Sequence, residues 1–108
     1  MTPTVSIVLP CYNGAGFLAQ SIESVVSQTF TDWELIIVND CSTDYSLEIM
    51  QQYAEKDGRI RIINNEQNLK LPGALNRGFQ EARGKYLTWT SHDNRMAPTM
   101  QTALVLIR

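Results

Sequence analysis

Cysteine is scarce in this sequence: Cys11 and Cys41 are the only two among 108 residues. Two cysteines are too few for a disulfide scaffold, and without a CxxC pair they do not predict a zinc site. We therefore expect both thiols to be reduced, small and partly buried.

Positive charge and long hydrophobic runs are also lacking. Nine Lys and Arg stand against 11 Asp and Glu, a net charge of −2, which gives no electrostatic reason to expect nucleic acid or an anionic membrane surface. No apolar run approaches the roughly 20 residues of a membrane span, and the N-terminus lacks the basic region of a signal peptide. We expect a cytoplasmic protein, at most peripheral to the inner face of the membrane.

What is present is a regular alternation of two hydrophobic patterns. Short apolar runs at residues 5–10, 33–39, 59–63 and 86–90 predict strands, the third at a sheet edge. Helical spacing of apolar residues predicts helices at 17–28, between Asp44 and Gly58, and at 72–82. Gly58 suits a left-handed position after its helix, and Pro98 begins a fourth helix that continues through Ile107.

This β-α-β-α-β-α-β-α order predicts one α/β domain over residues 1–108. Right-handed crossovers between parallel strands give an open, mainly parallel sheet of about four strands, with helices on both faces. We expect the strand order 3-2-1-4. Ligands of such sheets bind at the carboxyl ends of the strands, beside the switch point between the first and fourth strands, where the strand order reverses.

Acidic and aromatic residues follow the strands at that edge. Tyr12 follows the first strand, Asp40 the second, and Asp93, beside His92, the fourth. Carboxylates gathered in one crevice predict a divalent cation and, with it, a diphosphate ligand. Tyr12 could then stack on a base, and Asp40 could accept a hydrogen bond from a base N–H.

Simpler interpretations exist for each feature. Residues 91–94 have the composition of a solvated turn. Asp40 and Asp44 could cap the following helix; we favour that role for Asp44 and a ligand role for Asp40, which lies at the strand end.

A glycine motif favours a different ligand. Gly14-Ala-Gly16-Phe-Leu-Ala19 matches the Gly-x-Gly-x-x-Ala of dinucleotide-binding folds, and Asp40 lies near the place of their ribose acid. In those folds, however, the first glycine turns directly out of the strand, whereas residues 10–13 intervene here. NAD binding is therefore a lesser alternative.

Four blocks of sequence resemble the N-terminal half of family 2 glycosyltransferases. They are residues 5–13, 21–30, 33–44, and 84–87 with 91–94. The resemblance covers essentially the whole chain and implies the GT-A fold and sugar transfer from a nucleotide sugar, usually with inversion. The acceptor would be a glycan or lipid-linked glycan in polysaccharide biosynthesis.

The resemblance also implies roles for individual residues. Tyr12, between Pro10 and Asn13, matches the position over the nucleotide base, and Asp40 matches the acid that contacts uracil. Asp93 matches the last acid of the Asp-x-Asp-like motif and would bind Mg²⁺ or Mn²⁺ on the diphosphate.

Two residues depart from the family pattern. His92 stands where the family often has Asp; as a softer metal ligand it would tilt the site from Mg²⁺ toward Mn²⁺. Lys70 stands where a glycine is common, and its ammonium could instead reach a phosphate.

The resemblance assigns no catalytic residue to this chain. In the family the general base and most of the acceptor site come from a later segment, so we expect a nucleotide-binding part that transfers sugar poorly or not at all by itself. An exposed C-terminal helix would favour self-association. The alternative is a non-catalytic nucleotide-binding or interaction module with the same fold.

Overall fold

The computed structural model of the chain describes residues 3–28, 31–90 and 106–107. Strands and helices alternate through these ranges, as the sequence predicts. The elements are β1 (Val5–Cys11), α1 (Ala15–Val26), β2 (Trp33–Asn39), α2 (Ser46–Lys56), β3 (Ile60–Asn64), α3 (Lys70–Glu81), β4 (Tyr86–Trp89) and β5 (Leu106–Ile107).

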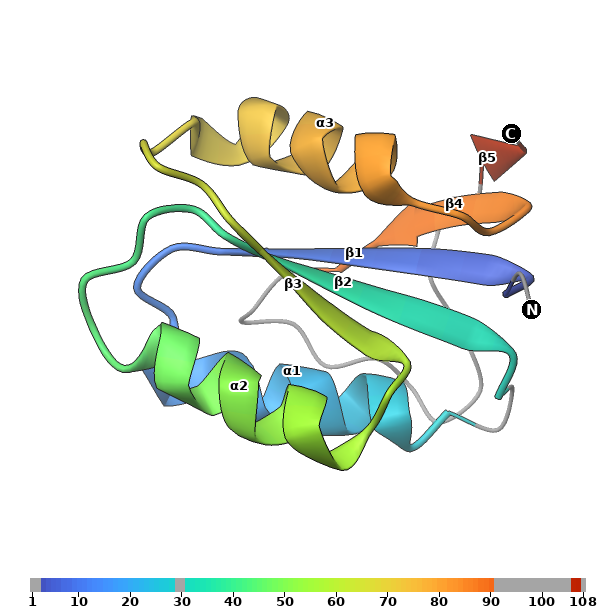
Figure 1. Cartoon of the computed structure of the whole chain (residues 1–108), viewed down its shortest axis with the longest axis horizontal. Helices are drawn as coiled ribbons and strands as arrows, with labels where there is room; N and C mark the ends of the chain where they lie inside the picture. Colours follow the sequence, from blue (N-terminus) through green and yellow to red (C-terminus); the bar gives the residue numbers. More distant parts are fainter. Residues whose placement is uncertain (1–2, 29–30, 91–105, 108) are drawn as a thin grey trace.

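The strands form one sheet in the order β3-β2-β1-β4-β5. β1 pairs in parallel with both β2 and β4, and β3 pairs in parallel with β2 at the edge. The predicted order 3-2-1-4 is confirmed (Figure 1). The predicted switch point is confirmed too: β2 and β3 are added on one side of β1, and β4 on the other.

The prediction of a helix from Pro98 through Ile107 is wrong at its end. Leu106–Ile107 is a short strand that pairs antiparallel with β4, Tyr86 opposite Ile107 and Leu87 opposite Leu106. A short apolar run does not distinguish a helix from a strand by periodicity, and the free edge of β4 offers backbone partners. Residues 98–105 lie outside the described ranges, and the exposed helix on which the predicted self-association depended does not reach residues 106–107.

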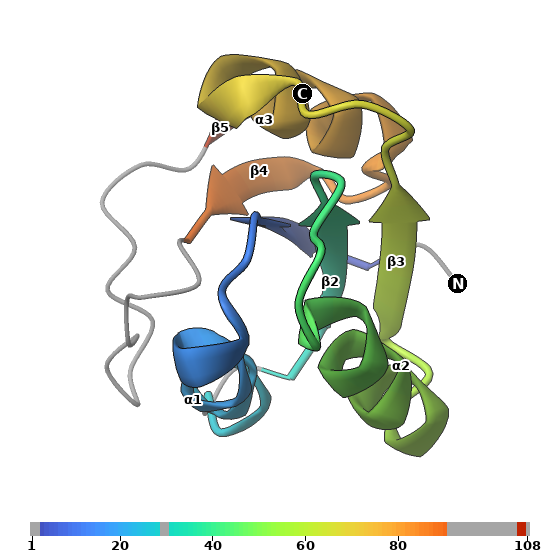
Figure 2. The ribbon, with the colours of Figure 1, turned by 90° about the vertical axis from the view of Figure 1, so that its left-hand side faces the viewer.

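Helices cover both faces of the sheet (Figure 2). α1 and α2 lie on one face, over a core cluster that includes Ile7, Leu9 and Ile37. α3 lies on the other face, over a smaller cluster that includes Val8, Ile36 and Val38. Because side chains alternate along a strand, β1 and β2 contribute to both layers, and nearly continuous apolar runs result.

α3 lies close to the sheet because glycine is at the contact. A Cβ at Gly78 would overlap the Cγ1 of Val8 and lie 3.1 Å from the Cγ2 of Val38. A larger residue would push the helix away from β1 and β2.

Pro10 lies in β1 although it has no N–H for a ladder. The carbonyl of Val8 accepts from Thr90 on the β4 side, whereas that of Cys11 accepts from Asp40 on the β2 side. Like Val8, Pro10 has its backbone polar groups on the β4 side of the strand. The pairing of β1 with β4 ends before Pro10, at Val8 opposite Trp89. The missing donor therefore costs no sheet hydrogen bond.

Gly58 does not have the left-handed conformation that the sequence predicted, since no glycine in the described ranges has a positive φ angle. α2 instead ends at Asp57, whose backbone is extended at φ −139° and ψ 111°. The Asp57 carboxylate accepts from the Arg59 amide at 3.0 Å and pairs with the Arg59 guanidinium at 2.8 Å. An aspartate turn thus replaces the glycine turn.

A buried carboxylate ties the α3–β4 connection to the amino edge of the sheet. Glu34 accepts from the Ser6 hydroxyl at 2.5 Å and from the Arg83 amide at 2.6 Å, and Arg61 lies 3.2 Å away. Ser6 in turn accepts from the Gly84 amide at 2.7 Å. This network lies at the end of the sheet opposite the loops described next.

Candidate functional site

The loops that follow β1, β2 and β3 come together at the carboxyl edge of the sheet, which faces the viewer in Figure 2. Backbone hydrogen bonds join each of these loops to its neighbour at the strand ends. The Asp40 amide donates to the carbonyl of Cys11, and the Asn65 amide donates to the carbonyl of Asn39, both at 2.9 Å. The expected gathering at one edge is therefore present for the first three loops, whereas the loop after β4 lies outside the described ranges.

Asp40 is the central side chain of this edge. It is only 4% exposed, and its Oδ1 accepts from the Asn65 side-chain amide at 2.9 Å and from the Leu69 backbone amide at 2.8 Å. Within the described part of the chain, no hydrogen bond reaches Oδ2. One carboxylate oxygen is thus fixed by the protein, and the other remains an acceptor for a ligand.

The strand register explains why Asp40 meets Asn65. β2 and β3 pair in parallel with Asn39 opposite Asn64, so the next residue of each strand lies side by side. The Asn39 side chain also donates to that of Asn64 at 2.9 Å, which supports the same alignment.

Tyr12 follows Cys11, whose carbonyl accepts from the Asp40 amide. Tyr12 is 47% exposed. The other large exposed hydrophobic residues of the described ranges also occupy the ends of strands or the starts of helices at this edge: Phe17, Tyr45, Leu69, Leu71 and Trp89. Apolar surface is therefore concentrated where a ligand or another part of a protein would bind.

Asn13 links two of the loops. Its backbone has φ 51°, its amide donates to the Ser42 hydroxyl at 3.0 Å, and its Oδ1 accepts from the Thr43 amide at 2.7 Å. Asn13 thus holds the β1–α1 loop against the β2–α2 loop. Direct contact of its side chain with a nucleotide stays a prediction.

The start of α1 is occupied by the protein itself. The amide of Gly14 donates to the Ser46 hydroxyl at 3.0 Å, and the amide of Ala15 donates to Asp44 at 3.2 Å. Asp44 also accepts from the Ser46 amide at 2.9 Å. A dinucleotide fold needs these helical amides for its pyrophosphate. A carboxylate here disfavours the NAD interpretation.

The local hydrogen bonds keep Asp44 ionised. Burial raises the pKa of Asp44, but hydrogen bonds from Ser46 and from the Ala15 amide outweigh it and lower the pKa below its ordinary value. Asp44 therefore satisfies the first amide of α2, as the predicted capping role requires, although Tyr45 and not Asp44 is the N-cap residue. Asp44 also satisfies the first amide of α1.

Lys70 begins α3 with φ 66°, and its amide donates to the Asn68 side chain at 2.9 Å. A left-handed backbone at this position gives a physical reason for the glycine that the resemblance implies there. The side chain is exposed, and its contact with a phosphate stays a prediction.

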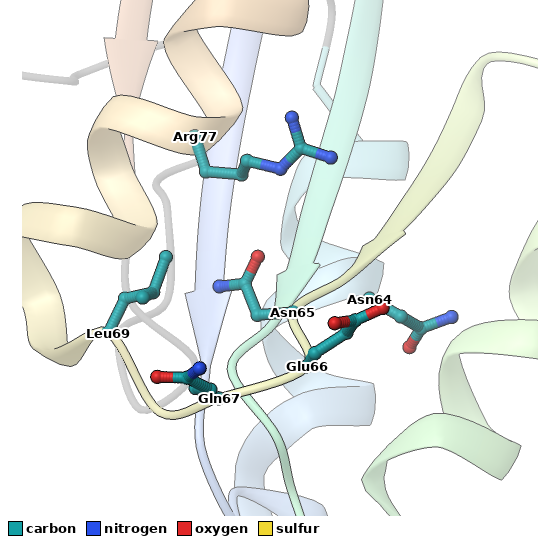
Figure 3. A pocket seen from close by; sticks show the side chains of 6 residues that line it. All are labelled: Asn64, Asn65, Glu66, Gln67, Leu69 and Arg77. Carbon is teal, nitrogen blue, oxygen red and sulfur yellow. The ribbon is translucent and has the colours of Figure 1, made fainter.

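An open pocket of about 370 Å³ lies beside Asp40, between α3 and the β3–α3 loop (Figure 3). Asn65 and Leu69, the two residues that hold Asp40, form part of its wall. Its lining is mostly polar: Asn64, Asn65, Glu66, Gln67, Leu69 and Arg77.

The described residues give neither cysteine the partners of a metal site. Burial raises the pKa of the Cys11 thiol, which keeps it neutral. Within residues 3–28, 31–90 and 106–107, no group of three or more His, Cys, Asp or Glu side chains could hold a metal ion. His92 and Asp93, the predicted metal ligands, lie outside the described ranges.

Comparison with known families identifies the family of the chain. Residues 6–106 match the family model described as glycosyl transferase family 2. The chain belongs to glycosyltransferase family 2. The helices of this family 2 chain that the structure describes include none long and apolar enough to cross a membrane.

Relatives in Bacillus subtilis (strain 168) agree with this assignment. The uncharacterized glycosyltransferase EpsJ is 41% identical over 100 residues, which are 93% of this chain and 29% of EpsJ. TuaG, named for teichuronic acid biosynthesis, is 37% identical over 93 residues, 86% of this chain and 37% of TuaG. The chain therefore spans about a third of the length of these relatives.

Solved structures show the same GT-A architecture. Residues 1–349 of S. aureus TarS in complex with UDP-GlcNAc match with a TM-score of 0.82 and 26% identity, over 88% of this chain and 28% of that TarS chain. The mannosyltransferase PcManGT from Pyrobaculum calidifontis, in complex with GDP-Man and Mn²⁺, matches with a TM-score of 0.82 over 91% of this chain and 30% of PcManGT. Its identity is 21%, so this likeness concerns the fold alone.

The fold brings together Pro10, Tyr12, Asn13 and Asp40 at one edge, with Lys70 at the start of α3. Sequence reasoning does not single out Asn65, which lies in a polar loop. The available signal is indirect, because β2 and β3 both end in Asn. If these two residues lie opposite each other, the residues that follow them, Asp40 and Asn65, become neighbours.

Proposed function

We propose that this chain binds the nucleotide of a UDP-sugar for inverting transfer of the sugar to an acceptor hydroxyl. The observation that carries the proposal is Asp40, a buried carboxylate with one oxygen fixed and the other left as an acceptor. A uracil ring offers a matching donor at N3–H. TarS structures in complex with UDP and with UDP-GlcNAc support this choice of donor.

The aromatic ring of Tyr12 would cover the base. Tyr12 is half-exposed and follows Cys11, whose carbonyl accepts from the Asp40 amide. Stacking on such a ring stabilises a bound base by about 1–3 kcal/mol. Pro10 fixes the backbone before Tyr12, and Asn13 fixes it afterwards through Ser42 and Thr43.

We assign the divalent cation to Asp93 with His92. They follow β4 in the sequence, and β4 pairs in parallel with β1, so β4 ends at the same edge of the sheet as the strands before Tyr12 and Asp40. Mn²⁺ or Mg²⁺ there would neutralise the diphosphate as it leaves. Lys70, an exposed cation at the start of α3, would add a second positive charge.

In the reaction the acceptor oxygen bonds to the anomeric carbon on the face opposite UDP. The bond from that carbon to the β-phosphate oxygen breaks, UDP leaves with the electron pair, and a base takes the hydroxyl proton. We propose that this base and the site for a glycan or lipid-linked acceptor belong to sequence equivalent to the remaining length of the relatives.

Calorimetric titration with UDP tests the proposal. We expect binding that depends on Mn²⁺, that is weaker with Mg²⁺ because His92 is a softer ligand, and that is lost in Asp93→Ala. Glu55→Ala, which removes an exposed carboxylate from α2, is the control and should bind normally.

Absence of UDP binding, with or without metal, would contradict the proposal. The non-catalytic interaction module would then become the better account of the fold.

A further inference from the structure

The side chain of Asn65 has one defined orientation. Its Nδ2 donates to Asp40 Oδ1 at 2.9 Å, and because a carboxylate oxygen only accepts, the amide nitrogen must face Asp40. The amide oxygen therefore points away from Asp40, on the side of Arg77 in Figure 3.

Asn65 and Leu69 act on the same oxygen of Asp40. The Leu69 amide donates to Oδ1 at 2.8 Å, and together the two donors fix the rotation of the carboxylate. Oδ2 is left with its lone pairs and can only accept a hydrogen bond. The backbone of Asn65 is itself fixed, because its amide donates to the Asn39 carbonyl at 2.9 Å.

We propose that Asn65 is a positioning residue that sets the base preference of this site. By holding Asp40 with an acceptor toward the ligand, it favours uracil, whose N3 carries a proton, over cytosine, whose N3 is an acceptor. With a cytosine ring in the same place, a lone pair of N3 would face a lone pair of the Asp40 Oδ2, and the two would repel each other. This inference rests on the proposed UDP-sugar site and adds the residue that determines its selectivity.

A structural role for Asn65 makes a different prediction from a positioning role. If Asn65 only stabilised the β3–α3 loop, its removal would weaken all nucleotides by a similar factor. If Asn65 positions Asp40, removal should weaken UDP more than CDP. Gln67 is a suitable control, since it is an exposed amide residue that lines the same pocket without a hydrogen bond to Asp40.

The experiment is calorimetric titration of UDP and CDP, with Mn²⁺ present, into the chain and its Asn65→Ala, Asn65→Leu and Gln67→Ala variants. We expect the unmodified chain to prefer UDP by about 10-fold or more, the cost of an unmatched buried polar group. In Asn65→Ala this ratio should fall about 5-fold through loss of UDP affinity. Gln67→Ala should keep it.

Asn65→Leu keeps a branched side chain of similar size and covers the case in which the alanine variant does not fold. It removes the amide donor without adding a charge beside Asp40, so the preference for UDP should fall here too. Equal weakening of UDP and CDP in both Asn65 variants, or an unchanged ratio, would overturn the inference while UDP binding by the unmodified chain still supported the proposed function. Absence of UDP binding by the unmodified chain would overturn both.

Discussion

In the part of the chain that the structure describes, three residues other than glycine have positive φ angles, and each follows a different parallel strand. Asn13 has φ 51°, Cys41 has φ 68° and Lys70 has φ 66°. A left-handed backbone costs a residue with a Cβ about 1–2 kcal/mol, so the loops at the carboxyl edge store strain that the rest of the fold supports. Such strain is typical of ligand-binding loops.

Lys70 allows strain and charge to be separated. Lys70→Gly should raise the free energy of unfolding by about 0.5–1 kcal/mol, because relief of the left-handed strain exceeds the entropy that glycine adds to the unfolded chain. Lys70→Ala should give no such gain. If the ammonium contacts phosphate, both variants should bind UDP more weakly at low salt. Urea unfolding measures the stability of the two variants, and calorimetric titration measures their UDP affinity. Equal stability of the two variants would contradict the proposed backbone strain at Lys70.

Residue identity predicted part of the site. Pro10, Tyr12 and Asp40 could be placed at one edge because each follows or ends an apolar run. Asn65 could not, since its role depends on a one-residue alignment of β2 with β3, which the composition of the two runs does not specify.

At the scale of the elements, the glycine in α3 determines how closely that helix approaches the sheet. Gly78→Ala should destabilise the fold by about 1–3 kcal/mol, because its Cβ overlaps Val8 and the backbone of α3 must move. Gly16→Ala in α1, with nothing within 4 Å of the added Cβ, is the matched control. We expect it to be neutral or stabilising by up to about 1 kcal/mol. Similar melting temperatures for the two variants would contradict this packing argument.

The Glu34 network predicts how stability depends on pH. Burial raises the pKa of Glu34, but hydrogen bonds from Ser6 and Arg83 and the charges of Arg61 and Arg83 outweigh it, so the pKa lies below its ordinary value of 4.5. The carboxylate therefore stabilises the fold fully above about pH 4.5. That contribution is lost as the pH falls through the lower folded-state pKa.

Glu34→Gln should remove this pH dependence. At neutral pH the variant should be less stable by about 1–2 kcal/mol, since the arginine partners are partly exposed and screened by water. The difference from the unmodified chain should shrink in acid. Urea midpoints from about pH 3 to about pH 8 measure it. Glu48→Gln, on the exposed side of α2, should show a small and constant difference.

The elements were predictable where hydrophobic periodicity extended over a whole helix or strand. α1, α2, α3 and the four parallel strands all have such patterns. β5 has only two residues, and its strand conformation comes from pairing with the edge of β4. The end of α2 was predicted from a glycine, whereas the Asp57 side chain makes the turn.

For the molecule as a whole, the two edges of the sheet have different roles. The amino edge holds the hydrogen-bonded network around Glu34. The carboxyl edge collects the exposed aromatic and aliphatic side chains, the left-handed loop residues and the Asp40 oxygen that remains an acceptor. The proposed ligand site thus lies opposite the Glu34 network, at the carboxyl ends of the strands where open α/β sheets bind their ligands.

UDP binding by Asp40→Asn tests the central claim most directly. The new side chain can still accept from Asn65 and Leu69 at Oδ1, but the atom at Oδ2 becomes a donor. We expect UDP affinity to fall about 10–100-fold in calorimetry, the loss of a hydrogen bond to a charged group, with an unchanged melting temperature. Asp32→Asn, before β2 at the amino edge, should bind normally. UDP affinity equal to that of the unmodified chain in a folded Asp40→Asn variant would contradict the account.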